Sequence, residues 1–386
     1  MELLLFLIIP VVVALLLLFF YKKEVTIQEA IGIVIPSFII IGICYAVSYF
    51  SLTNSTEYYG DYAVKITHYD DWDEWIHRTC TRQVACGTDS KGRTRYRTET
   101  YDCSYRDYHP DRWVITTKSG NELYVDEPIY NKIRKQWNVK EHFKDMHRHY
   151  YTKDGDAQYY VWDDNISTLF DITTTHNYTN KIKASKSIFA FEDISKKEAK
   201  KLGLFDYPKV VDYEQNPING YRKITKADEQ SLRMVNGIYG AKHQIRVFLN
   251  CFYNKDLSIS KKQQSYWVGG NKNEFVINVC LDSLSNKLLW VDAFSWMDEP
   301  KLEVKTEQFI RDLDTLNIVK TSDYLYKEIP TSWKRKEFKD FDYLSIELTE
   351  TQFYVTLFIV IAYVIASSII FIKNDLKNEN IFISKY

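Results

Sequence analysis

Cysteine is sparse in this chain, with six residues in 386, too few for the disulfide framework that stabilises small secreted domains. An excess of basic charge is also missing, because 50 Lys and Arg face 51 Asp and Glu, for a formal net charge of -1. We therefore expect no nucleic-acid partner. Internal repeats and low-complexity segments are absent, as are a P-loop, a GxGxxG turn and a Ser-His-Asp order. Nucleotide binding and triad-type hydrolysis thus have no signature here.

What the chain has instead is three long apolar runs. They are Leu3–Phe20, Ala30–Phe50 and Tyr354–Ile372. The second run carries no charge and is long enough, at 1.5 Å per helical residue, to cross a hydrocarbon core of about 30 Å. The three runs predict a multi-pass integral membrane protein whose first partner is the lipid bilayer.

The first run can also be read as a signal peptide. However, Glu2 rather than a basic cluster precedes it, no small-x-small cleavage site follows, and Lys22 and Lys23 lie on its far side. We therefore predict a retained span over residues 3–20, followed by a second span over residues 30–50. Pro10 is compatible with a transmembrane helix.

Basic residues in the short segments set the predicted orientation. Lys22 and Lys23 lie between the first two runs, and Lys373, Lys377 and Lys385 follow the third. The positive-inside rule places both segments in the cytoplasm and the large intervening region outside it. The basic residues at 334–339 oppose this orientation, but long domains translocate largely regardless of charge. We predict an extracytoplasmic large region and a cytoplasmic tail over residues 373–386.

The first part of the large region, residues 54–219, is predicted to be β-rich. Alternating apolar residues indicate a strand at Tyr62–His68, and a Lys-Ser-Gly-Asn turn joins Arg112–Thr117 to Glu122–Val125 as a hairpin. Residues 126–137 look helical, and a capping box at Ser195 predicts a short helix that ends at Gly203. The Asn-Pro-Ile-Asn-Gly stretch at 216–220 marks the predicted domain boundary.

A cluster of potential metal ligands lies in this first part. It contains His77, Cys80, Cys86, Cys103 and His109. Thiolate and imidazole groups can form a tetrahedral zinc site, although the Cys-x5-Cys spacing differs from a Cys-x2-Cys knuckle. The alternatives are free thiols or one disulfide, most simply Cys86–Cys103, in an oxidising compartment. A second group, Met146–His149, reads as a solvated polar segment or as a metal-binding His pair.

The second part, residues 220–344, has an α/β pattern. A capping box at Thr225 begins a helix predicted to end at Gly240. Apolar strands are predicted at residues 244–253, 273–282 and 287–293, with a short helix at 260–267 before a Gly-Gly break. Continuous apolar strands are expected where both faces of a sheet are covered. Amphipathic helices are predicted at residues 303–316 and 322–341.

This order of elements carries a resemblance. The stretch from Tyr266 through Gly269-Gly270 into Phe275–Val279, followed by Leu289–Val291, resembles the TPM domain, an α/β module of membrane-anchored proteins. Arg78–Thr81 and Tyr101–Tyr105, together with this tail, also resemble an uncharacterised family of bacterial and phage membrane proteins. The TPM resemblance implies acid phosphatase activity or calcium binding, whereas the second resemblance implies no activity.

Acidic residues offer a candidate cation site in the second part. Asp282 and Asp292 lie at the predicted ends of adjacent strands, with Asp298 and Glu299 just beyond. Carboxylates that converge at a sheet edge can bind calcium or magnesium, which prefer oxygen ligands. The alternative is ordinary turn chemistry at strand ends.

The sequence therefore predicts an α+β membrane protein with three transmembrane helices (the third at residues 354–372), a β-rich subdomain and a TPM-like α/β subdomain. Its 30 Tyr and 9 Trp favour interfaces. The first functional hypothesis is a non-catalytic envelope module that binds or assembles with another membrane or envelope protein. The second is a divalent-metal phosphohydrolase of TPM type. A transporter ranks last, because the spans contain no charged residue.

Overall fold

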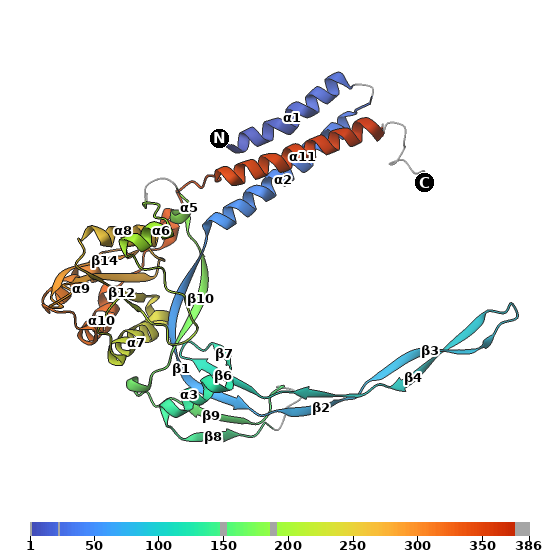
Figure 1. Cartoon of the computed structure of the whole chain (residues 1–386). Coiled ribbons are helices and arrows are strands. Elements are labelled where there is room, and N and C mark those ends of the chain that lie inside the picture. Colours follow the sequence, from blue (N-terminus) through green and yellow to red (C-terminus); the bar gives the residue numbers. More distant parts are fainter. Residues whose placement is uncertain (1, 22–23, 147–152, 186–190, 375–386) are drawn as a thin grey trace. The chain divides into compact units, whose positions relative to one another are not determined.

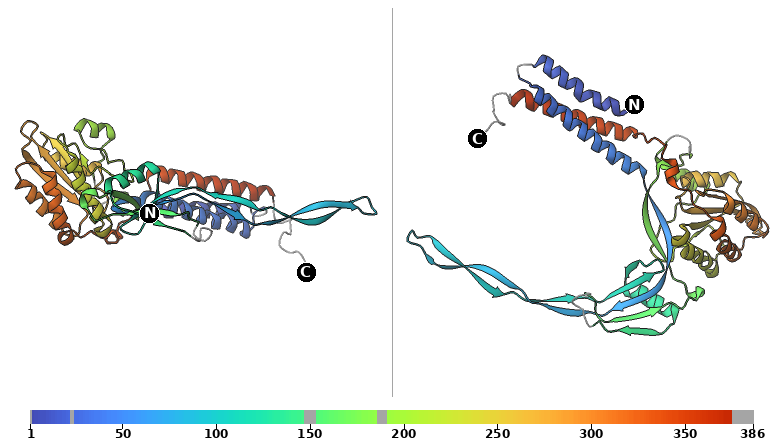
Figure 2. Two further views of the ribbon diagram at one scale, coloured as in Figure 1. Left: turned by 90° about the horizontal axis from the view of Figure 1, so that it is seen from below. Right: turned by 180° about the vertical axis from the view of Figure 1, so that it is seen from behind.

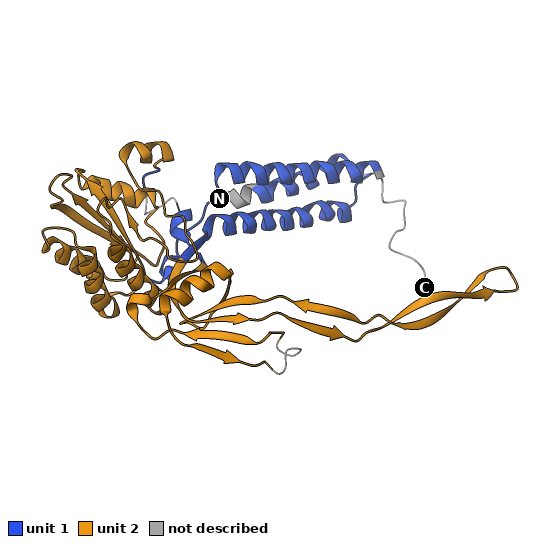
Figure 3. Cartoon of the chain, turned by 60° about the horizontal axis from the view of Figure 1, so that its bottom comes forward, with its two compact units in different colours: residues 1–57, 177–193, 336–386 blue, residues 58–176, 194–335 orange. Residues whose placement is uncertain are grey.

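The computed structural model describes residues 2–21, 24–146, 153–185 and 191–374. The chain divides into two compact units (Figure 3). Unit 1 comprises residues 1–57, 177–193 and 336–386, and unit 2 comprises residues 58–176 and 194–335. Most of the residues assigned to the two predicted subdomains, including the boundary at 216–220, therefore lie together in unit 2. The mixed α+β class is confirmed, whereas His147 and His149 of the polar segment lie outside the described residues.

Unit 1 consists mainly of three apolar helices. They are α1 (Glu2–Phe20), α2 (Ile27–Thr53) and α11 (Glu350–Asn374), which coincide with the three apolar runs. They lie side by side (Figure 2) and bury a shared cluster that includes Phe6, Ile33 and Val360. Helices α2 and α11 are long and apolar enough to cross a membrane, while the apolar helix Phe6–Phe20 is shorter. Short helices α5 (Lys181–Ala184) and η2 (Phe338–Phe341) also belong to this unit.

Unit 2 contains a sheet in the order β7-β6-β1-β9-β8, with β10 also paired to β1 (Figure 1). Its strands are β1 (Asn54–Tyr69), β6 (Arg112–Thr117), β7 (Glu122–Val125), β8 (Glu141–Lys144), β9 (Ala157–Val161) and β10 (Asp171–Thr179). The hairpin β6–β7 is confirmed. Helix α3 (Glu127–Trp137) packs its Ile133 and Trp137 into the same core as Ile66 and Ile115. A 3-10 turn, η1 (Ile166–Thr168), precedes β10.

The second sheet of unit 2 has the order β11-β12-β13-β14. Its strands are β11 (Ile218–Asn219), β12 (Arg246–Tyr253), β13 (Glu274–Leu281) and β14 (Leu288–Ser295). The first three are parallel and β14 is antiparallel. All eight residues of β13 are buried, as the continuous apolar pattern predicts for a strand covered on both faces.

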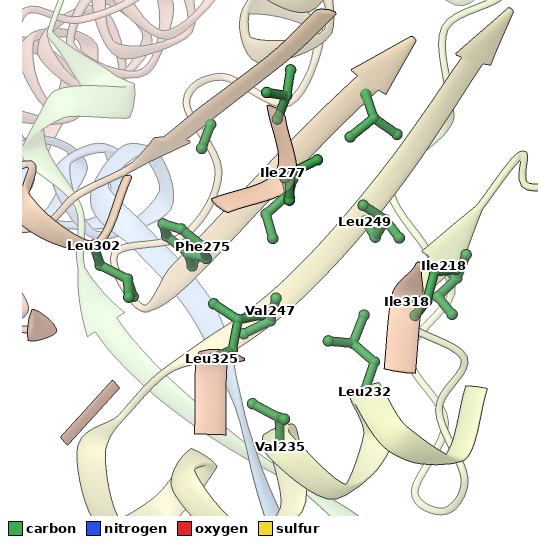
Figure 4. Close-up of a cluster of buried hydrophobic side chains, with 14 of the residues drawn as sticks. Ile218, Leu232, Val235, Val247, Leu249, Phe275, Ile277, Leu302, Ile318 and Leu325 are labelled. Carbon is green, nitrogen blue, oxygen red and sulfur yellow. The ribbon is translucent and has the colours of Figure 1, made fainter. Parts of the chain in front are cut away.

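Helices cover both faces of this sheet. On one face α7 (Lys226–His243), α9 (Lys301–Arg311) and α10 (Ile318–Ser332) enclose the largest core, where Leu232, Leu302 and Leu325 meet Val247 and Ile277 (Figure 4). On the other face lie α6 (Lys196–Leu202) and α8 (Ser258–Tyr266). The cap of α6 at Ser195 and its end at Gly203 are as predicted. The result is a three-layer α/β/α arrangement.

The predicted end of α7 at Gly240 is wrong. The helix continues to His243, and Gln244 adopts the left-handed conformation that terminates it. Gly240 is needed for another reason, because the backbone of Gly60 in β1 crosses the helix at this point. A Cβ atom on Gly240 would lie 2.2 Å from the Gly60 carbonyl oxygen.

The last two helices of unit 2 also differ from the expectation. The chain leaves α9 at Arg311, five residues before the predicted end, and Asp314 takes a left-handed φ of 56°. Leu316 is nevertheless buried in the core. The predicted burial of this residue is therefore confirmed, although it lies outside the helix. Asn317 then caps α10 by accepting a bond from the Lys320 amide. Because Asn317 is the N-cap, α10 begins at Ile318, four residues before the predicted start at residue 322.

Candidate functional site

A long β-hairpin, residues 72–109, is the most exposed part of unit 2. It consists of two consecutive ladders, β2 (Trp72–Ile76) with β5 (Tyr105–His109) and β3 (Thr79–Thr88) with β4 (Thr94–Asp102) (Figure 1). We call this hairpin the arm. Each ladder has only two strands, and most side chains of the outer ladder and half of those of the inner ladder are exposed. Two-stranded ladders bury little apolar surface and are marginally stable alone.

One disulfide closes the outer ladder, between Cys80 and Cys103, whose Cα atoms are 5.8 Å apart. The predicted pairing Cys86–Cys103 is wrong. The register explains the correction, because Cys80 lies opposite Tyr101 and close to Cys103, where the outer ladder begins. Cys86 lies six residues further along β3, about 20 Å away at the rise of a strand, far beyond disulfide reach. The observed bond spans 23 residues and stabilises by about 3 kcal/mol on the chain-entropy model.

The disulfide removes two ligands from the predicted zinc set. Cys86 remains as an exposed thiol. His77 is exposed beside Trp75, whereas His109 stacks on Trp72 with ring centroids 4.3 Å apart. Of the five residues, the structure therefore joins only Cys80 and Cys103, and among the described residues His109 lies in a different group of potential ligands, with Glu74 and Asp107.

The cysteine arrangement gives a direct prediction for the intact protein. Alkylation under non-reducing conditions should label Cys86 fully, because its thiol is exposed, and should leave Cys80 and Cys103 unlabelled. After reduction, both should accept label. Peptide mass spectrometry distinguishes this from the alternative pairing, in which Cys80 would be labelled and a Cys86–Cys103 peptide recovered.

The four acidic residues of the candidate cation site do not converge. Asp282 accepts bonds from the amides of Leu284 and Ser285, which lower the pKa of its carboxyl group and close a turn. Asp292 pairs with Asn278 in mid-strand, about 13 Å from Asp282 at the rise of a strand.

Asp298 and Glu299 lie beyond the other end of β14, where Asp298 forms an ion pair with Lys334 at 2.5 Å. The expectation failed because β14 is antiparallel and ends at the opposite edge from β13. Ordinary turn and ion-pair chemistry accounts for Asp282 and Asp298.

Asp292 instead terminates a polar row that sequence reasoning missed. Asn219, Asn250, Asn278 and Asp292 occupy one register position across all four strands. The amide of Asn250 donates to Asn278 at 2.9 Å, and Asn278 donates to the Ser260 hydroxyl of α8 at 2.7 Å. The hydroxyl in turn donates to Asp292 at 2.5 Å.

This row divides the apolar contacts of one sheet face into two clusters. One cluster contains Phe252 and Cys280, and the other contains Phe248 and Val276. Asn250, Asn278 and Ser260 are fully buried and hydrogen-bonded. A satisfied buried network fixes register and helix placement, so this row specifies the position of α8 on the sheet.

A second buried polar group begins the same strands. Arg246 lies opposite Glu274, and their side chains are 3% and 1% exposed. Burial raises the pKa of the Glu274 carboxyl group, while bonds from Tyr207 and Asn271 oppose the shift. Hydrogen bonds from Tyr207 and Asn271 occupy both oxygens of the Glu274 carboxylate, which indicates a structural role for this group.

Hydroxyl–imidazole chemistry is weakly represented in the described part of the chain. Thr174 Oγ1 lies 3.1 Å from His176 Nε2 on β10, and the ring of His176 packs on Tyr59. Both Thr174 and His176 lie on a strand surface, and His176 is exposed. This contact offers no enclosed site for a substrate.

Comparison with family models, curated proteins and solved structures finds no match for this chain.

Proposed function

We propose that this chain is a membrane-anchored, non-catalytic binding or assembly module that contacts another membrane or envelope protein through the arm. The single observation that carries the proposal is the set of exposed aromatic rings, distributed over both faces of a hairpin that has no core of its own. Its exposed rings are Trp75, Tyr96, Tyr101, Tyr105 and Tyr108, at 43–63% exposure. Tyr and Trp supply large contact areas at low entropic cost and dominate binding hot spots.

Guanidinium groups accompany these rings. Arg82 lies 5.4 Å over the ring of Tyr101, and Arg97 holds Glu99 at 2.6 Å on the same face. A shallow hollow beside the disulfide is lined by Tyr101 and six neighbours, His77, Arg78, Thr79, Thr100, Asp102 and Ser104. Aromatic and arginine side chains around a hollow are typical of protein-binding surfaces.

The membrane topology is part of the proposal. The packing of α1 against α2 and α11 supports three spans rather than two. The Cys80–Cys103 disulfide supports an oxidising, extracytoplasmic location for unit 2. With the lysines near the apolar runs, this places the tail after Lys373 in the cytoplasm. The helix and strand order from α7 to α9 supports a TPM-like α/β part.

The alternative remains a divalent-metal phosphohydrolase of TPM type. Its metal site would need Asp282 and Asp292, which the sheet keeps about 13 Å apart. The binding module is therefore preferred. Phosphate release that depends on calcium, magnesium or manganese and is abolished by Asp282→Ala would reverse the preference.

If the arm is the binding surface, the partner should be crosslinked at arm residues. A photo-crosslinking phenylalanine analogue at Tyr96 or Tyr101 of the full chain, in native membranes, should give one discrete adduct. The same analogue at Phe143 or Tyr124, which are about as exposed as Tyr96 and more exposed than Tyr101 but lie on the six-stranded sheet, is the matched control. Mass spectrometry should identify the adduct, and reciprocal capture by the tagged partner should recover this chain.

Substitution then tests the energetics. The double change Tyr96→Ser and Tyr101→Ser should weaken capture by roughly tenfold or more, because each buried aromatic anchor contributes about 1–2 kcal/mol. Equal adducts at arm and control positions, or unchanged capture by the double variant, would refute the proposed function.

A further inference from the structure

The inner ladder of the arm places two carboxylates directly opposite each other. Glu74 of β2 pairs with Asp107 of β5, and the adjacent pair on the same face is Trp72 with His109. Like charges directly opposite each other destabilise an antiparallel pair. This position therefore favours a bound cation.

The imidazole of His109 completes a set of three ligand atoms. Its Nε2 atom lies 3.3 Å from Glu74 Oε2 and 3.8 Å from Asp107 Oδ2, and all three atoms lie within 4.8 Å of one another. Ligands at the usual 2.0–2.1 Å from a tetrahedral zinc ion are separated by about 3.4 Å. The observed spacing thus needs only small side-chain movements to fit such an ion.

The residues around the three ligand atoms fix the His109 ring and leave the Asp107 side of the group exposed to solvent. His109 stacks on Trp72 with an interplanar angle of 11°. The side chains of His109 and Glu74 are 22% and 18% exposed, whereas Asp107 is 46% exposed. One imidazole nitrogen and two carboxylate oxygens are donor types that zinc accepts, and a water can take the fourth position of a tetrahedral site. Calcium, by contrast, takes six to eight oxygen ligands.

A lysine ammonium group lies where it would compete with a metal ion for Glu74. The ammonium of Lys153 contacts Glu74 and lies 6.0 Å over the ring of Trp72. Lys153 is half exposed, at 51%, so its long side chain can leave into solvent.

We propose that Glu74, Asp107 and His109 form a zinc site at the root of the arm, and that Lys153 occupies its carboxylate edge in the metal-free state. The site differs from the predicted cysteine-based set, since it uses no thiolate. It is independent of the protein-binding function, because the arm's exposed aromatic residues lie outside the ligand set. Zinc would clamp β2 to β5.

The test is a zinc titration of the full chain in detergent against a competing chelator, in a Cys86→Ser background that removes the exposed thiol. One ion should bind per chain. Lys153→Met removes the competing ammonium and should raise the affinity by roughly tenfold, a gain that misfolding cannot produce. His109→Ala and Glu74→Gln should each lower it by about tenfold or more.

His77→Ala is the matched control, because His77 is the other histidine of the arm and lies outside the ligand set. It should leave the affinity unchanged. The proposal is overturned if no stoichiometric binding occurs, if His77→Ala lowers affinity as much as His109→Ala, or if Lys153→Met has no effect. Retention of the Cys80–Cys103 bond in each variant shows that the cysteines of the arm have paired as in the unchanged chain.

Discussion

Replacing Gly240 with alanine should destabilise unit 2 by at least about 3 kcal/mol, beyond the ordinary range for overpacking. The added Cβ would lie 2.2–2.5 Å from the carbonyl oxygen, nitrogen and Cα atoms of Gly60. These are backbone atoms, so relief requires moving strand β1 away from helix α7. Thermal or denaturant unfolding of the full chain in detergent measures the loss.

Gly237→Ala is the control for this variant, one turn earlier in the same helix. Its Cβ would lie 3.3 Å from the Leu169 side chain, 3.4 Å from the Asp61 carbonyl oxygen and 3.6 Å from the Asp171 Cβ, so none of its contacts is as short as those at Gly240. Alanine also favours the helix by up to about 1 kcal/mol over glycine. We expect stability close to that of the unchanged chain. If Gly240→Ala behaves like Gly237→Ala, the close crossing of β1 and α7 is not as described.

Asn278→Leu should cost about 3 kcal/mol. Leucine has the same branched heavy-atom skeleton, although it is larger, and it leaves the amide of Asn250 and the hydroxyl of Ser260 without one partner each. Each buried group left unsatisfied costs about 1–3 kcal/mol. The free energy of unfolding of the full chain is again the measurement.

A double-mutant cycle separates this network from simple packing. Asn250→Leu combined with Asn278→Leu should cost at least about 1 kcal/mol less than the sum of the single changes, because the orphaned partners disappear together. Strict additivity would contradict a hydrogen-bonded row. The half-buried Asn219, at the end of the row, provides the control: Asn219→Leu should cost less than either internal change.

Local signals were sufficient for several elements. The β6–β7 hairpin follows from a turn sequence between two alternating segments, and Thr225 begins α7 through a capping box with Asp228. Such signals involve residues three to six positions apart, so the structure they predict does not depend on tertiary contacts with the rest of the chain.

Signals that depend on distant partners were misread. Gly240 resembles a helix end in sequence, but its role depends on Gly60, 180 positions earlier. The cysteine pairing depends on where β3 and β4 come into register, which no spacing rule specifies. Asn250 and Asn278 are each the fifth residue of a buried strand, and this shared position was the available clue to the polar row. Its meaning required knowing that the strands are adjacent and parallel.

The interruption between the two ladders of the arm has a mechanical consequence. The paired register stops after Ile76 and resumes at Thr79, and the disulfide lies at the start of the outer ladder. Across the interruption the Cys103 amide donates to the Arg78 carbonyl oxygen at 2.9 Å, and the Arg78 amide donates to the Ser104 hydroxyl at 3.1 Å. Because the ladder is weakest there, we expect bending to be concentrated at residues 77–78 and 103–104, with the outer ladder moving as one rigid spoke. Ten residues of β3 at about 3.3 Å each give that spoke a length of roughly 33 Å. The tip of the arm could therefore contact a partner at a distance from residues 77–78 that exceeds the thickness of a bilayer core, about 30 Å.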